Sequence, residues 1–172
     1  MHAAVITLRI VHVLSAIFWG GTLLFTTFYL FPAAASAGPA AGPVMGALRD
    51  RGFITAMPIA AVLTILSGGT LLWIDSAGDM GAYMRSPVGR TFAMAGGLAI
   101  LAFLIGIVLA RPIGMKMMQL VPEAHTISDG PARGAIQAQI KELQKKMAMY
   151  TMVVAIMMII AMIGMATARY MG

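Results

Sequence analysis

The sequence has no cysteine, few acidic residues and little charge of either sign. Without cysteine there can be no disulfide, no thiolate metal site and no cysteine nucleophile, so any metal must be held by histidine, methionine, carboxylate or backbone oxygen. Asp and Glu together number six, and charged residues make up 10% of the 172 residues. A soluble domain carries about 25% charged residues. The composition therefore excludes an ordinary soluble domain.

What the chain has instead is long apolar runs. Hydrophobic residues make up 60% of it, and its mean hydropathy is +0.88. Four runs are long enough to cross a bilayer as helices, at about 4–31, 53–74, 88–110 and 148–168. Residues 131–147 predict an amphipathic helix that joins the fourth run without a break. We expect a single all-α membrane domain, residues 1–172, forming an antiparallel four-helix transmembrane bundle with helical cytoplasmic extensions of spans three and four.

The connections between the runs are rich in helix breakers. Pro32 and the small residues of 33–43 predict a flexible connection after span one, and 75–87 predicts a short polar turn. Pro122 is expected to end the helical extension of span three. No internal repeat is evident in the sequence.

The basic residues indicate the orientation. The side with the first and third connections carries eight, against four on the other side. The eight are Arg49, Arg51, Arg111, Lys116, Arg133, Lys141, Lys145 and Lys146, and the four are Arg9, Arg85, Arg90 and Arg169. Because basic loops stay in the cytoplasm, both termini are expected outside, in a bacterial inner membrane.

The net charge of +6 has the same explanation. The basic residues flank apolar spans, which indicates topology and contact with anionic lipid, not nucleic acid. The expected partner is the lipid bilayer, and a homo-oligomer or a larger membrane complex is compatible with the sequence.

Span one carries polar side chains on one face. Arg9, His12 and Ser15 follow at spacings of three, so on a helix they lie near one another, a turn apart. An ionisable group inside the hydrocarbon costs about 2.5–3.5 kcal/mol on insertion scales, which makes it a functional candidate. His12 is the only histidine inside a span. Three interpretations are open: a ligand of haem or metal, a histidine that hydrogen-bonds within the bundle, or a protonatable relay.

Three arginines are expected at the level where the spans meet the outer surface: Arg9, Arg90 and Arg169. A buried histidine with arginines above it suits haem, because imidazole takes the iron and guanidinium groups pair with propionates. A second axial ligand would be a methionine, water or nothing. The candidate methionines are Met57, Met157, Met158, Met162 and Met165. Methionines are also ordinary apolar packing residues.

Other chemistry has little basis in the sequence. No serine, histidine and carboxylate are placed as a nucleophilic triad, no glycine-rich phosphate loop follows a strand, and no acidic residue lies inside a span. We therefore assign no catalytic residue, and a hydrolase or an ion-coupled transporter is not expected.

Residues 9–21, which read RIVHVLSAIFWGG, together with Phe31-Pro32 resemble the opening of a known superfamily. It contains copper resistance protein D, the HemJ-type protoporphyrinogen oxidases and several uncharacterised bacterial membrane families. The stretches 68–73, 88–90 and 110–112 also resemble it. The resemblance implies a four-helix membrane bundle, with haem b on the span-one histidine in the HemJ branch and copper handling in the copper branch.

HemJ-type proteins have a functional lysine in span three, and here 90–96 contains none. The resemblance is therefore closest to the uncharacterised members. The leading hypothesis is a haem b-binding membrane protein involved in electron transfer or a redox step, with His12 as axial ligand and Arg9, Arg90 and Arg169 as propionate partners. The alternatives are copper transfer, with His12 as metal ligand, and a structural subunit of a larger membrane complex.

Overall fold

The computed structural model describes residues 2–171, without the side chains of Pro39 and His125. The elements are α1 (His2–Phe25), η1 (Thr26–Leu30), α2 (Phe31–Ala37), η2 (Gly38–Ala41), α3 (Gly42–Asp50), α4 (Phe53–Asp75), α5 (Met80–Arg85), α6 (Pro87–Ile105), η3 (Gly106–Ala110), α7 (Arg111–Thr126), α8 (Pro131–Thr167) and η4 (Ala168–Tyr170). Within residues 2–171 there is no strand, as the all-α prediction requires.

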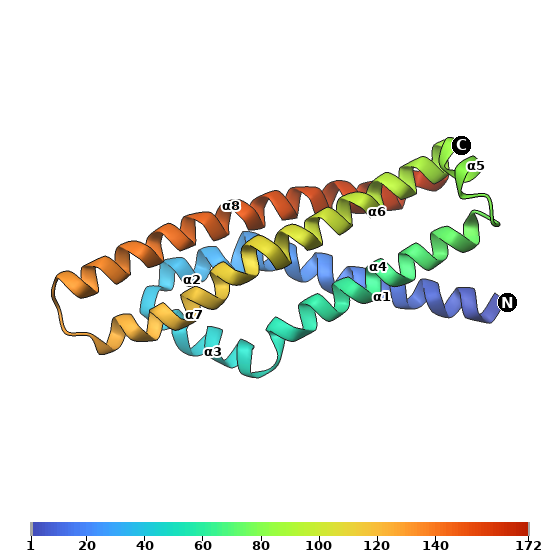
Figure 1. Cartoon of the computed structure of the whole chain (residues 1–172). Coiled ribbons are helices and arrows are strands. Elements are labelled where there is room, and N and C mark those ends of the chain that lie inside the picture. The colour runs from blue at the N-terminus through green and yellow to red at the C-terminus, as the bar shows by residue number, and fades with distance from the viewer. Residues whose placement is uncertain (1, 172) are drawn as a thin grey trace.

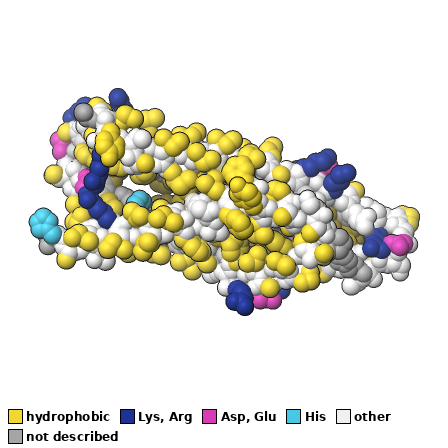
Figure 2. Space-filling model, turned by 180° about the vertical axis from the view of Figure 1, so that it is seen from behind, with side chains coloured by type: hydrophobic (Ala, Val, Ile, Leu, Met, Phe, Trp, Pro, Cys, Tyr) yellow, Lys and Arg dark blue, Asp and Glu magenta, His cyan; other side chains and the backbone are white. Residues whose placement is uncertain are grey.

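Four helical stretches are long and apolar enough to cross a membrane. They are His2–Ala37, Phe53–Asp75, Pro87–Ala124 and Pro131–Tyr170. Hydrophobic side chains cover most of the visible face, and charged side chains gather at both ends and in a cluster at its lower edge (Figure 2). The two termini lie at the same end, so consecutive long helices run in opposite directions (Figure 1). The prediction of four apolar helices is confirmed.

The four helices associate as two closely packed pairs, α1 with α4 and α6 with α8. A core in the middle of the bundle joins the pairs. The rings of Trp19 on α1 and Phe103 on α6 meet edge to face, with centroids 6.2 Å apart. Ala61, Ala102 and Met158 are buried around them.

The chain forms two helical hairpins, the first from α1 to α4 and the second from α6 to α8. Both have the same sequence of elements, which was not predicted from the sequence. In each, a long helix (α1 or α6) passes through a π-helical turn (η1 or η3) into a further helix that has proline at its second position, Pro32 or Pro112. A return helix, α4 or α8, then packs against the long helix. The architecture therefore repeats once along the chain.

The segments that were predicted to interrupt the helices are themselves largely helical. Residues 33–43, predicted as a flexible connection, lie within α2, η2 and the start of α3, so that prediction is wrong. The turn that does reverse the chain is at Gly52, whose φ of 81° suits glycine. Pro122 lies inside α7, which continues to Thr126, and 75–87 contains the short helix α5.

The predicted join between the amphipathic segment and the fourth apolar run is confirmed, since α8 is one helix of 37 residues. Its first part packs against α7, with Ile136, Ile140, Leu143 and Met147 partly buried. At Gly114 of α7, an added Cβ would lie 3.3 Å from Cε of Met147, so the two helices are in close contact there.

Candidate functional site between α1 and α4

The His12 imidazole lies in a notch that Gly68 leaves in α4. A Cβ added at Gly68 would be 2.7 Å from Cε1 of His12 and 3.1 Å from Nδ1, closer than side chains pack. The hydrogen atom of glycine is what allows the ring to lie against the α4 backbone. Within the run of small residues Ser67–Thr70, Gly68 is therefore the position that receives a side chain from α1.

A hydrogen bond shows which nitrogen of this ring is the donor. Nδ1 of His12 lies 2.9 Å from the carbonyl oxygen of Thr64 and 3.3 Å from Oγ of Ser67. A carbonyl can only accept, so Nδ1 carries the proton and donates it to Thr64. In the neutral form of a ring with this donor, the lone pair is on Nε2. Histidines that bind metals commonly make such a bond through the other ring nitrogen.

A short network of hydroxyl groups continues from His12 toward the core. Oγ1 of Thr64 lies 3.0 Å from Oγ of Ser15, and the Ser15 hydroxyl donates to the carbonyl of Val11 at 2.6 Å. Ser15, Thr64 and Ser67 are all buried. Their hydrogen bonds offset the cost of burying polar groups, about 1–3 kcal/mol for each group left unpaired. This network holds α1 and α4 in one register.

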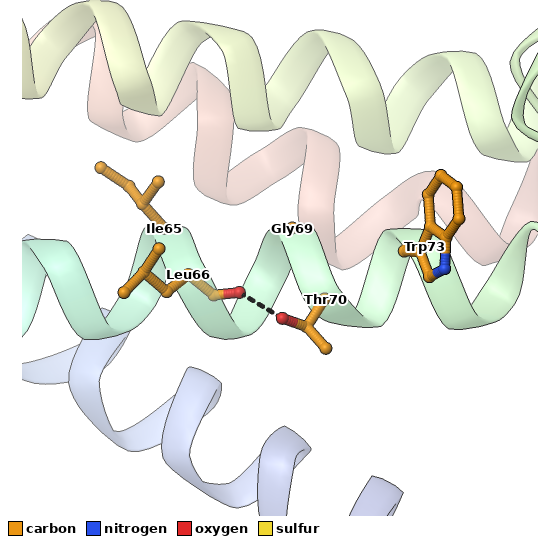
Figure 3. A pocket seen from close by; sticks show the side chains of 5 residues that line it. All are labelled: Ile65, Leu66, Gly69, Thr70 and Trp73. Atoms are coloured by element: carbon orange, nitrogen blue, oxygen red, sulfur yellow. Dashed lines mark hydrogen bonds between the residues drawn. The ribbon is translucent and has the colours of Figure 1, made fainter.

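The surface around α1 and α4 is hollowed in two places. Figure 2 shows a hollow in the apolar surface, toward the end that carries the termini. On α4 a shallow groove of about 380 Å³ runs over Gly69, the neighbour of Gly68, with Ile65 and Trp73 on either side (Figure 3). The Thr70 hydroxyl in this groove donates to Leu66 of its own helix at 2.8 Å. The groove adds no charged group to the site.

A charged cluster lies at the end of the bundle that carries the termini. Nη2 of Arg9 is 3.7 Å from Oδ1 of Asp75, and both side chains are about a third or more exposed, at 44% and 34%. Burial raises the pKa of the Tyr83 hydroxyl, the Asp75 carboxylate raises it further, and Arg169 opposes them. Asp75, Tyr83 and Arg169 therefore share one electrostatic environment.

Arg90 is exposed in the first turn of α6. This helix begins at Ser86, whose side chain accepts a hydrogen bond from the backbone N–H of Gly89, and Pro87 takes the first helical position. Arg9, Arg90 and Arg169 were predicted to lie together at the outer end of the bundle. Of these three, only Arg9 has a carboxylate within 4.0 Å in the described part of the chain. Sequence reasoning did not predict that pair.

The methionines considered as second ligands are used in packing. Met158 and Met162 lie against Gly20 of α1, and Met165 lies against Gly96 of α6. Met57 and Met157 pack on the central core. Gly20 is roughly 12 Å along α1 from His12, at 1.5 Å per residue. Among the side chains that the structure describes, no group of three or more histidine, cysteine, aspartate or glutamate residues is placed to hold a metal.

Sequence reasoning found the helix face of α1 but missed the groups that meet it. Thr64, Ser67, Gly68 and Asp75 complete the site, and all four belong to α4. A signal was present, because Thr64, Ser67 and Gly68 are spaced like one helix face inside an apolar run.

Comparison with models of known families, with curated proteins and with solved structures finds no match for this chain.

Proposed function

We propose that this protein is a membrane protein that binds haem b through His12 and takes part in electron transfer. The observation that carries the proposal is the Nδ1 hydrogen bond to the Thr64 carbonyl, which orients the ring and leaves Nε2 as the nitrogen for a ligand. The sequence resemblance to the superfamily that includes HemJ-type proteins supports the same assignment.

The residues present suit an axial histidine. Nε2 of His12 makes no hydrogen bond within residues 2–171, and the ring is only partly buried. Haem would supply a one-electron carrier at this place. The protein's own contribution is to hold the imidazole in one orientation through Gly68 and Thr64, between the apolar helices α1 and α4.

Arg9, Arg90 and Arg169 are the proposed propionate partners. Arg90 and Arg169 are exposed, and the Arg9 guanidinium is bound to Asp75 only by a long, half-exposed contact. Exposed ion pairs contribute about 0–1 kcal/mol, so Arg9 can exchange this carboxylate for another at little cost. We also propose that this end faces outward, because the opposite end has the larger share of basic residues.

The visible spectrum of the purified protein tests the proposal. Protein expressed with ample haem should show a Soret band, and His12→Ala should lose it, because the axial nitrogen is gone. His2→Ala is the matched control, since it removes a histidine from the same end of α1 and should keep the band. A wild-type protein without the band, or a His12→Ala variant with an unchanged one, would refute haem ligation by His12.

Metal analysis of the same preparation separates the alternatives. If the protein binds haem, metal analysis should find iron in a fixed ratio to protein. Stoichiometric copper with no haem would point to copper transfer instead. A cofactor-free protein isolated as a constant component of a larger membrane complex would point to a structural subunit.

A further inference from the structure

Four basic residues lie at one level of the molecule, where α7 and α8 pack together. The contact between Gly114 of α7 and Met147 of α8 sets this level. Lys145 and Lys146 directly precede Met147, and Arg111 and Lys116 lie within about one helical turn of Gly114. All four are exposed. We call Arg111, Lys116, Lys145 and Lys146 the basic collar.

The charge of the basic collar is mostly uncompensated. Nζ of Lys145 lies 2.9 Å from a carboxylate oxygen of Glu142, and both side chains are more than 60% exposed. The other three collar residues have no carboxylate within 4.0 Å among the described residues. The pKa of Glu142 is lowered, first by the Lys145 hydrogen bond and then by the charges of the neighbouring lysines. The collar is therefore a region of positive potential.

The distance from the basic collar to the outer arginines matches a bilayer. Lys146 and Arg169 are separated by roughly 34 Å along the last helix, and Arg90 and Arg111 by roughly 32 Å along α6 and η3, at 1.5 Å per residue. The hydrocarbon core of a bilayer is about 30 Å thick. If Arg90 and Arg169 lie at one headgroup layer, the collar lies at the other.

We propose that the basic collar binds the phosphate groups of anionic phospholipids in the leaflet at that end. Charge complementarity is the reason: three unpaired cations and one weakly paired cation lie beside the α7–α8 contact, about one hydrocarbon thickness from the outer arginines. Each such cation near an anionic leaflet strengthens association about fivefold. The α7–α8 hairpin would thus be held at a fixed depth while its tip extends into the aqueous phase. This binding does not depend on haem.

Spin-labelled lipids give a direct test. The full-length protein is reconstituted in phosphatidylcholine with a trace of spin-labelled phosphatidylglycerol or phosphatidylcholine, and electron paramagnetic resonance measures the protein-bound share of each. We expect wild type to prefer phosphatidylglycerol. In the triple variant Lys116→Gln, Lys145→Gln, Lys146→Gln, the preference for phosphatidylglycerol over phosphatidylcholine should be at least about fivefold weaker. Arg85→Gln, which removes one charge at the other end, should retain it.

Two outcomes would overturn the proposal: a wild type without preference, or a triple variant that keeps it. If the triple variant does not fold, the salt dependence of wild type decides. The Debye length falls from about 10 Å at 0.1 M to about 3 Å at 1 M salt, so the preference should fall steeply over that range. A preference that does not change with salt would show that another property of the lipid is recognised.

Discussion

Gly68 is the residue on which the geometry of the candidate site most depends. Helices inside a membrane use small residues so that their backbones can approach. Here the space left by glycine is filled by an imidazole ring from the facing helix, which brings Nδ1 of His12 to the Thr64 carbonyl. The neighbouring Gly69 has no such contact, since an added Cβ there would meet nothing within 4 Å. These adjacent glycines therefore form a matched pair for mutagenesis.

We expect Gly68→Ala to displace the imidazole and break the Nδ1 bond. The added methyl group would overlap the ring, and such overpacking costs about 1–3 kcal/mol. Nitrogen-15 NMR of the histidine ring reports which nitrogen carries the proton, and thermal unfolding reports stability. Gly68→Ala should lose the fixed Nδ1–H form and unfold at lower temperature, whereas Gly69→Ala should keep both. Equal behaviour of the two variants would show that the notch does not hold His12.

The part of the site on α1 could be predicted from sequence, and the part on α4 could not. Arg9, His12 and Ser15 lie on one helix, where spacing alone sets which side chains share a face. The bond from His12 to Thr64 and the pair of Arg9 with Asp75 depend on the rotation and height of α4 against α1. No local pattern specifies that register, because it results from packing along the whole length of both helices.

Pro32, which follows η1, was expected to end the helix before it, and Pro112 follows η3 in the same way. The backbone at these two places explains why the chain stays helical. Proline lacks an N–H, and its ring clashes with the carbonyl four residues earlier. In both places the chain widens into a π turn, so that the N–H of Phe31 reaches Thr26 and that of Arg111 reaches Gly106. The following proline then occupies the start of a new helix, a position it tolerates. A proline read from sequence alone predicts a break, whereas here a π turn absorbs the strain.

Gly114 and Met147 are in close contact where α7 packs against α8 in the second hairpin. Replacing Gly114 with leucine should push α7 away from α8, at a cost of about 1–3 kcal/mol, because Met147 can adjust only in part. Gly134→Leu is the control, since an added Cβ there meets nothing within 4 Å. Limited trypsin digestion measures the effect, and cleavage next to Lys116 should be faster in Gly114→Leu than in Gly134→Leu. Equal rates would mean that this contact does not hold the two helices together.

At the scale of the whole molecule, the fold consists of two similar hairpins with different interiors. The first has the polar contacts of His12, Ser15, Thr64 and Ser67 between its helices. At the corresponding interface of the second, Gly164 lies against Ala95 and Gly96 against Met165. Composition and hydropathy were sufficient to predict four apolar helices. The repeated plan and its chemical asymmetry emerge only when the helices are paired in space.

The absence of cysteine makes the proposed orientation directly testable, because any single introduced cysteine is the only thiol. Met84 on α5 and Ser128 in the α7–α8 connection lie at opposite ends and are exposed. Eight basic residues on the Ser128 side against four on the other predict that this end is cytoplasmic. A membrane-impermeant maleimide should therefore label Met84→Cys in spheroplasts and Ser128→Cys only after lysis, with the cysteine-free protein as the blank. The reverse pattern would place His12 in the cytoplasmic half, so that electrons would reach it from the cytoplasmic side.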